Sequence, residues 1–342
     1  MTLVALALTR AIEARALELG FDAVGVGPAT PPPHATDFER WLDAGYAGTM
    51  HYLARTRAER VDPSRLLPGV RSVVAVALNY GPPRDASDGG WRPVARYARG
   101  RDYHDLMRPR LRALADFIDG AAHAGTRSRA AVDTSAVLER DLAARAGLGW
   151  IGKNTNLLAP QAGSYFFIGI VLTTAALEPT GAQPDRCGTC TACLDACPTQ
   201  AFVAPYVLDA RRCLSYLTIE HRDDIAPDLA PHMRDWVFGC DVCQEVCPWN
   251  RHAPATRVPA LAPAGELGSI TSLLDLDDEG FRARFKPTAI ARTKRRGLVR
   301  NAALMLGNRR DASATPALRR LAEDSDPVVR RAAAWALARL ND

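Results

Sequence analysis

The chain has 342 residues, of which 47% are hydrophobic and 24% are charged. This balance is typical of a soluble globular protein of two or three domains, and it excludes a disordered or fibrous chain. No stretch approaches the roughly 18 consecutive apolar residues that cross a bilayer. The N-terminal residues fit a helix over Val4–Leu19 rather than a signal peptide, so we expect a cytoplasmic protein without membrane contact.

The net charge of +5 is unevenly distributed along the chain. From Arg282 to the end there are 15 Lys and Arg residues against 5 Asp and Glu, whereas the preceding residues have 28 against 33. Such asymmetry indicates a C-terminal part that binds a polyanion. A solvated helical surface would have the same composition and remains the alternative at this point.

Residues 1–177 show the alternating patterns of an α/β (α+β) domain. Helical patterns cover Val4–Leu19, Asp105–Ala122 and Ala136–Ala146. Strand-like runs cover Val70–Leu78, Ala130–Asp133 and Tyr165–Thr173. Residues 147–154 nearly fit the dinucleotide and phosphate-loop motifs, but both motifs need a strand before the glycines and a helix after them. Here a helix comes first and Gly147 is expected to cap it, so we reject nucleotide binding.

All eight cysteines lie in the next segment, 178–252. In a reducing compartment such a density indicates metal or redox chemistry rather than disulfides. The first four have the spacing C-x2-C-x2-C-x3-C-P, which is typical of bacterial ferredoxins with 4Fe–4S clusters. A second group, Cys240, Cys243 and Cys247 before Pro248, lacks one cysteine of this pattern, and the isolated Cys213 can supply the missing ligand.

In two-cluster ferredoxins the fourth cysteine of a group ligates the other cluster. Applied here, this rule divides the eight cysteines into two sets of four. One predicted cluster is held by Cys187, Cys190, Cys193 and Cys247. The other predicted cluster is held by Cys197, Cys213, Cys240 and Cys243. A pair of structural zinc sites is the alternative, but zinc ribbons usually separate their C-x2-C pairs by about a dozen residues or more.

Residues 253–342 begin with a Pro- and Ala-rich linker that ends near Gly268. The segments Leu298–Gly307 and Val328–Leu337 resemble each other, and a helix over Thr315–Leu321 is predicted between them. Paired Ala-rich helices at this period of about thirty residues resemble HEAT-like repeats. Because such a small number of repeats is not stable alone, we expect these helices to dock on the preceding domain.

Taken together, the motifs resemble the epoxyqueuosine reductase family, and the matching segments run through nearly the whole chain. They are residues 60–63, 101–104, 132–134, 147–154, 187–198, 212–218 and 239–248, with the HEAT-like end. Members of this family carry out the last step in making queuosine in tRNA. They remove the epoxide oxygen of epoxyqueuosine at the wobble position as water and leave an alkene.

The resemblance implies a cobalamin in the N-terminal domain, facing two 4Fe–4S clusters that receive electrons from an external low-potential donor. The implied cobalamin contacts are Arg60, Asp133, Leu157, Ile168, Ser215 and Asp241. For Arg60, the alternative is a surface ion pair with Asp62 or Glu59. For Ser215, the alternative is a hydroxyl that caps a helix. Residues 102–104 begin like the cobalamin motif D-x-H-x-x-G, but position 107 is Met, so no lower-ligand histidine is predicted.

Asp133 is the proton donor that the resemblance implies. An Asp after a strand and before a helix is also a good helix N-cap, which is the alternative. To act as an acid near neutral pH, this carboxyl needs a pKa raised by burial.

The resemblance also implies a tRNA partner for the basic C-terminal end. The predicted RNA contacts are Arg222, Lys286, Lys294, Arg295, Arg296 and Arg300. We expect the protein to act as a monomer. A corrinoid reductive dehalogenase, or a ferredoxin-like electron carrier joined to an interaction module, is the competing interpretation.

Overall fold

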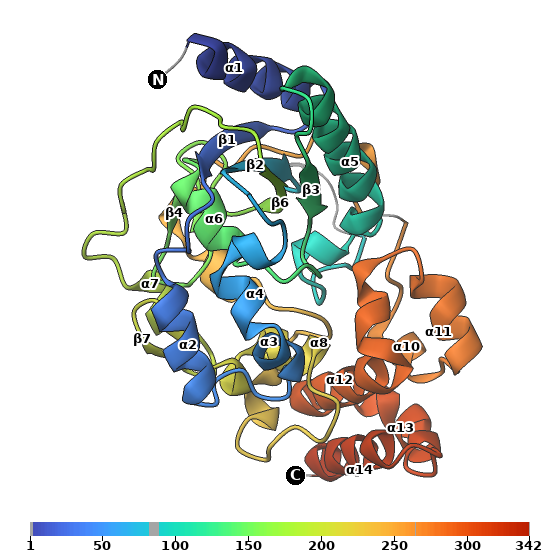
Figure 1. Cartoon of the computed structure of the whole chain (residues 1–342). Helices are drawn as coiled ribbons and strands as arrows, with labels where there is room; N and C mark the ends of the chain where they lie inside the picture. The colour runs from blue at the N-terminus through green and yellow to red at the C-terminus, as the bar shows by residue number, and fades with distance from the viewer. Residues whose placement is uncertain (1–2, 82–88, 264, 342) are drawn as a thin grey trace.

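The structure, a computed structural model, describes residues 3–81, 89–263 and 265–341. Within these ranges, no helix combines the length and the apolar character needed to cross a bilayer. Figure 1 shows a sheet with its covering helices at one end of the molecule and a group of C-terminal helices at the other.

The N-terminal domain is built on a four-stranded antiparallel sheet with the order β1-β2-β6-β3. Its strands are β1 (Ala23–Pro28), β2 (Ser72–Asn79), β3 (Ser128–Ala131) and β6 (Phe166–Thr173). Three of them confirm predicted strands, whereas β1 was missed because its Ala-Val-Gly-Val-Gly-Pro sequence has a weak strand pattern. The two central strands, β2 and β6, are apolar and almost fully buried.

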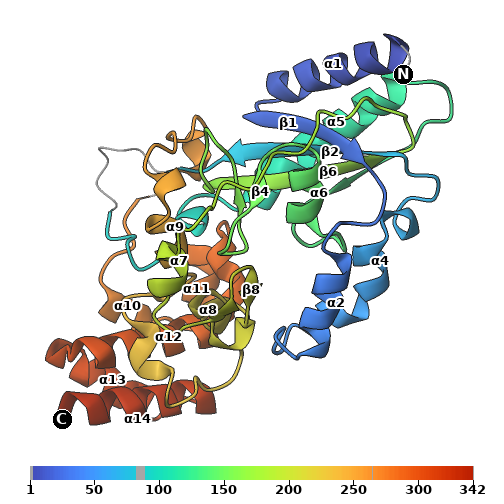
Figure 2. The same ribbon diagram turned by 90° about the vertical axis from the view of Figure 1, so that its left-hand side faces the viewer.

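Helices cover both faces of this sheet (Figure 2). On β2, Val74, Val76 and Leu78 pack with α1 (Leu3–Glu18) and α5 (Tyr103–Ala121). The alternate residues of β2 pack with α6 (Glu139–Arg145) on the other face. Because successive strand residues point to opposite faces, one continuous apolar run fills both layers of the core.

The helix predicted over Ala136–Ala146 is shorter than expected, since α6 begins only at Glu139. Its C-terminal end is as predicted: Gly147, at φ +86°, follows the C-cap residue. The N–H groups of Gly147 and Leu148 donate to the carbonyls of Ala144 and Ala143, which is a Schellman motif. The short strand β4 (Trp150–Ile151) comes next and pairs with β5 (Leu157–Leu158), so no helix follows the glycines.

The cysteine segment consists mainly of loops and short elements. They are α7 (Ala192–Asp195), β7 (Phe202–Ala204), β8 (Val207–Leu208), α8 (Leu214–Ile219) and α9 (Val242–Glu245). Three further helices lie between β1 and β2, namely α2 (Ala35–Asp43), α3 (His51–Arg55) and α4 (Arg57–Val61). The indole N–H of Trp41 donates to the Leu208 carbonyl at 2.6 Å and so ties α2 to the cysteine segment.

The C-terminal part is helical, as predicted. It contains α10 (Ile270–Leu274), α11 (Asp278–Phe285), α12 (Lys294–Arg309), α13 (Thr315–Leu321) and α14 (Pro327–Asn341). Helices α12 and α14 approach closely at Gly307, where a Cβ atom would lie only 2.8 Å from Cα of Ala336. Small residues at this crossing therefore let the two backbones pack against each other.

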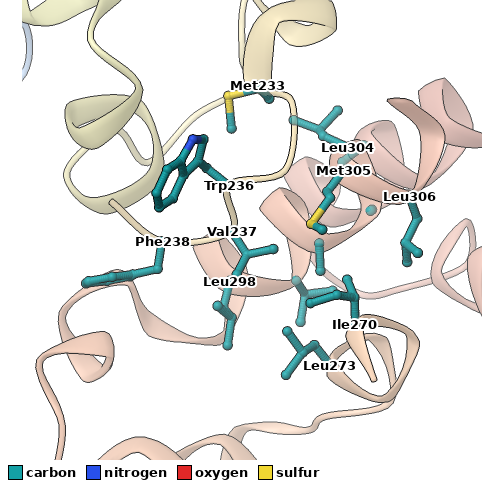
Figure 3. Packing of buried hydrophobic residues seen from close by; sticks show 14 of the residues in the cluster. Met233, Trp236, Val237, Phe238, Ile270, Leu273, Leu298, Leu304, Met305 and Leu306 are labelled. Atoms are coloured by element: carbon teal, nitrogen blue, oxygen red, sulfur yellow. The ribbon is translucent and has the colours of Figure 1, made fainter. Parts of the chain in front are cut away.

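The expectation that these helices dock on the preceding part of the chain is confirmed. Figure 3 shows side chains of residues 233–238 beside side chains of α10 and α12. Trp236, Val237 and Phe238 share one buried cluster with Leu298, Met305 and Leu306. The C-terminal helices therefore share their core with the cysteine segment.

Candidate active site

A cavity of about 330 Å³, partly open to solvent, lies where the N-terminal sheet meets the cysteine segment. Strands β5 and β6 contribute apolar side chains, including Leu157 and Ile168. The cysteine segment contributes Cys213, Cys240 and Cys243. Amide and hydroxyl groups also line the cavity, from Asn154, Asn156, Ser164, Ser215 and Gln244.

Five of the six residues predicted to contact a corrinoid line this cavity: Asp133, Leu157, Ile168, Ser215 and Asp241. The helix-cap alternative for Ser215 is wrong, because the N-cap residue of α8 is Cys213. Asp241 is 2% exposed and accepts hydrogen bonds from the backbone N–H and Nη1 of Arg96, at 2.8 and 3.2 Å. Burial raises the pKa of Asp241.

Arg60 is the sixth predicted residue, and it does not line the cavity itself. It is 8% exposed, so the alternative of a surface ion pair is wrong. Its Nε donates to Thr56 Oγ1 at 3.0 Å and its Nη1 donates to the Val137 carbonyl at 3.1 Å. Arg60 therefore holds the loop that leads from Asp133 into α6.

The cysteines gather into two neighbouring groups, and all eight are free of disulfides. Burial raises the pKa of Cys193, and the nearby Cys247, Cys187 and Cys190 raise it further. Burial also raises the pKa of Cys240, with added contributions from Cys213 and Cys197. The thiol neighbours of Cys193 and Cys240 belong to their own predicted sets, whereas those of Cys243 also include Cys193 from the other set. The division of the ligands between the two clusters stays a prediction.

Only the second set reaches the cavity. Its Cys243 Sγ lies 3.9 Å from the Asn156 amide nitrogen, and the Ala201 backbone N–H donates to Cys197 Sγ at 3.3 Å. In the first set, Cys190 is exposed at the surface. Among the described residues, no three His, Cys, Asp or Glu side chains are close enough to share a single metal ion.

Asp133 lies in the loop between β3 and α6, with a left-handed backbone φ of +47°. The N-cap residue of α6 is Leu138, so the helix-cap alternative for Asp133 is wrong. Its Oδ2 lies 3.3 Å from Nε2 of His104. The other ring nitrogen of His104, Nδ1, lies 2.8 Å from Oδ1 of Asp102, the N-cap residue of α5.

The electrostatics of this pair differ from the expectation. Burial acts to raise the pKa of Asp133, but the imidazole of His104 and the hydroxyl of Tyr103 outweigh it and lower that pKa. Burial acts to lower the pKa of His104, but its two carboxylate neighbours raise it to about 9. Near neutral pH the shared proton therefore lies on the imidazole, and the expected raised pKa of Asp133 is not found.

Sequence reasoning missed two titratable groups near Asp133, namely His104 and Glu139, of which only Glu139 lines the cavity. His104 belongs to a segment that carries the family resemblance, but we considered it only as a cobalamin ligand. Glu139, the first residue of α6, was not singled out, because nothing in its local pattern separates it from a surface glutamate. Burial, with a smaller contribution from the Asp133 carboxylate, raises the pKa of Glu139 to about 8.

The six predicted RNA contacts differ widely in exposure. Lys286, Lys294 and Arg296 are exposed, and the last of these pairs with Asp326. Arg222 donates to the carbonyls of Arg292 and Thr293, and Arg295 pairs with Asp324 at 2.5 Å.

Arg300 is 1% exposed. Its prediction as an RNA contact is wrong, because its guanidinium binds backbone carbonyls in the interior. The pattern of charge along the sequence does not distinguish such an interior arginine from a surface one.

Three family models match the chain. A 4Fe-4S double cluster binding domain matches residues 186–250, an epoxyqueuosine reductase model matches residues 60–134, and HEAT repeats match residues 289–342. The cysteine segment is therefore a double 4Fe–4S domain, and the zinc alternative is not supported. Fold and site together define an iron–sulfur reductase with a helical-repeat end.

Curated relatives cover nearly the whole chain. The epoxyqueuosine reductase of Gloeobacter violaceus is 44% identical over 89% of this chain and 97% of its own length. That of Pseudomonas aeruginosa is 41% identical over 97% of this chain and 94% of its own length. A crystal structure of an epoxyqueuosine reductase with an epoxyqueuosine-modified tRNA stem loop is 32% identical, covers 98% of this chain and 91% of the other, and has a TM-score of 0.89. The chain belongs to the epoxyqueuosine reductase family.

Proposed function

We propose that this chain reduces epoxyqueuosine in tRNA to queuosine, removing the epoxide oxygen as water and leaving an alkene. One observation carries the proposal: Asp133 shares a cavity with three cysteines of a double 4Fe–4S domain. Each oxygen removed requires two electrons and two protons. This cavity is bordered by a residue pair that holds a proton and by predicted cluster ligands, so protons and electrons can reach the same site.

Cobalamin is the group that we place in this cavity. The apolar walls of the cavity suit a corrin ring, and its amide and hydroxyl groups suit the amide side chains around that ring. Leu157, Ile168, Ser215 and Asp241 would contact it, while Arg60 would act through the loop that it holds. Bound there, cobalamin supplies a reduced metal centre able to react with the strained epoxide.

Electrons would enter through the cluster held by Cys187, Cys190, Cys193 and Cys247, because this set includes the exposed cysteine. The cluster held by Cys197, Cys213, Cys240 and Cys243 would pass them on, because three of these residues line the cavity. An external low-potential carrier is the source of the electrons in this proposal, and the protein acts as a monomer.

The protein groups that border the cavity hold and move the protons. The Asp133–His104 pair holds one proton, which passes through the Asp133 carboxylate to the epoxide oxygen. The N-cap residue of α6 is Leu138, so the Asp133 carboxylate does not cap that helix. Lys286, Lys294 and Arg296 would bind tRNA phosphates at the basic end.

The test is Asp133→Asn, which keeps the size of the side chain but cannot pass on a proton. We expect single-turnover reduction of an epoxyqueuosine-modified tRNA stem loop to slow by on the order of 10²–10⁴-fold. Corrinoid content, iron content and tRNA affinity should match those of the unmodified protein. Asp116→Asn makes the same change at an exposed position of α5 and should leave the rate unaltered. Rates within a few-fold for Asp133→Asn would remove Asp133 from the reaction.

A further inference from the structure

Reduction of an epoxide to an alkene places two protons on one oxygen. Both C–O bonds break, two electrons enter, a C=C bond forms, and the oxygen leaves as water. The Asp133–His104 pair holds one proton near neutral pH. If the proposed function is correct, the cavity needs a second proton source within reach of the same oxygen.

Glu139 lines the same cavity as Asp133. Its Oε1 atom is shielded from solvent and has no hydrogen-bond partner among the described residues. The Asp133 backbone hydrogen bond acts on the same carboxyl group and favours its charged form, but burial outweighs it. A buried carboxylate with one oxygen lacking a donor is costly, and the group avoids this cost by staying protonated. A neutral carboxyl group also has an O–H that it can donate into the cavity.

The groups around Glu139 act in both directions: the guanidinium groups of Arg140 and Arg60 lower its pKa, but burial and the Asp133 carboxylate outweigh them. The Asp133 carboxylate repels a negative charge on Glu139. The hydroxyl of Tyr103 is also near the Glu139 carboxyl group. The two nearby guanidinium groups are engaged elsewhere: Arg140 donates to the Thr155 carbonyl, and Arg60 donates to Thr56 and Val137. Neither forms an ion pair with Glu139 within the described ranges of the chain. The pKa of about 8 follows mainly from burial.

We propose that Glu139 is the second proton donor of the reduction. Its carboxylic proton and the proton of the Asp133–His104 pair are the two that leave with the epoxide oxygen as water. Glu139 then becomes a carboxylate and takes a proton from solvent through the open side of the cavity before the next turnover. This assignment rests on the proposed function, but the protonation state of Glu139 can be measured without it.

The variant that tests this assignment is Glu139→Gln, which keeps the shape and polarity of the side chain and removes its titrating proton. We expect single-turnover reduction of the epoxyqueuosine-modified stem loop to slow by about 10²-fold at neutral pH. In the unmodified protein the rate should begin to fall as the pH rises through about 8, whereas in the variant the fall should begin only near 9, where His104 loses its proton. Glu13→Gln, on α1 outside the cavity, should retain both the rate and its pH dependence.

Infrared difference spectroscopy supplies a readout that does not depend on turnover. The unmodified protein should show the carbonyl band of a protonated carboxyl group, and this band should disappear as the pH rises through about 8. The band should persist in Asp133→Asn and be missing from Glu139→Gln. A protein without such a band at neutral pH would overturn the inference, even if the variant fails to fold.

Two other outcomes would also overturn it. A Glu139→Gln rate within a few-fold of the unmodified protein would show that the second proton comes from elsewhere. Loss of corrinoid from this variant would make Glu139 a contact of the cofactor instead. If the unmodified protein fails to reduce the stem loop while the infrared band is present, the proposed function is wrong but the protonation state of Glu139 stands.

Discussion

Arg300 offers a quantitative test of how the C-terminal helices are attached. From α12 its guanidinium donates to three backbone carbonyls of the cysteine segment, those of Leu217, His221 and Asp223, at 2.6, 3.0 and 2.6 Å. Burial lowers the pKa of Arg300 to about 10, which still leaves the side chain charged at neutral pH. It is one of the largest side chains that are fully buried.

Arg300→Met keeps much of the side-chain volume but removes every donor. The three carbonyls then lose charged hydrogen bonds, each contributing roughly 1.5–3 kcal/mol, while the cost of burying a charge disappears. Each carbonyl left without a donor costs about 1–3 kcal/mol, and after the relief of charge burial we expect a net loss of about 3–5 kcal/mol. At about 2.1 cal/mol/K per residue, the unfolding entropy of 342 residues is near 0.7 kcal/mol/K, so Tm should fall by about 4–7 °C.

The matched control is Arg296→Ala, which breaks an exposed ion pair with Asp326 on the same helix. Such a pair contributes at most about 1 kcal/mol, so Tm should change by no more than about 1.5 °C. Thermal unfolding of the anaerobically prepared proteins measures both values. If Arg300→Met leaves Tm unchanged and instead weakens tRNA binding, our interpretation of Arg300 as an interior anchor is refuted.

Three further predictions follow from the site. Cys213→Ala should reduce the iron content from about eight to about four atoms per chain and retain one cluster signal, whereas two intact 4Fe–4S spectra would contradict the ligand sets. Replacing Lys286 and Lys294 with Ala should lower the slope of log affinity for tRNA against log salt by roughly 0.7–0.9 per lost contact, and an unchanged slope would place the RNA elsewhere. The pKa of His104, about 9 in the folded protein against 6.5 ordinarily, means that its stabilising contribution is complete below pH 6.5 and is lost as the pH rises through 9. Tm of the unmodified protein should therefore fall over this range relative to that of His104→Gln, and parallel Tm curves would exclude the carboxylate contacts of His104.

Local features of this protein could be predicted from the sequence because they depend on neighbouring residues. Cysteine spacing specifies how thiols can surround a cluster, and the double 4Fe–4S domain follows from it. Helical periodicity identified α1, α5, α12 and α14 to within a few residues. Gly147 ended its helix as predicted, since the left-handed conformation is a local property of glycine. The boundaries of the three domains stay a prediction, because one buried cluster joins parts of all three segments.

The tertiary structure decided what depends on distant neighbours. Arg300 and Arg296 are both arginines of one helix, but only the first packs against the carbonyls of the cysteine segment and is buried. Asp133 has a lowered pKa because the fold brings it to His104, a residue of α5 that lies far from it in the chain. Glu139 has a raised pKa because the same fold buries it beside the Asp133 carboxylate. The burial of a side chain and the charges around it depend on residues from many segments, so its pKa and exposure cannot be predicted from the pattern of one segment.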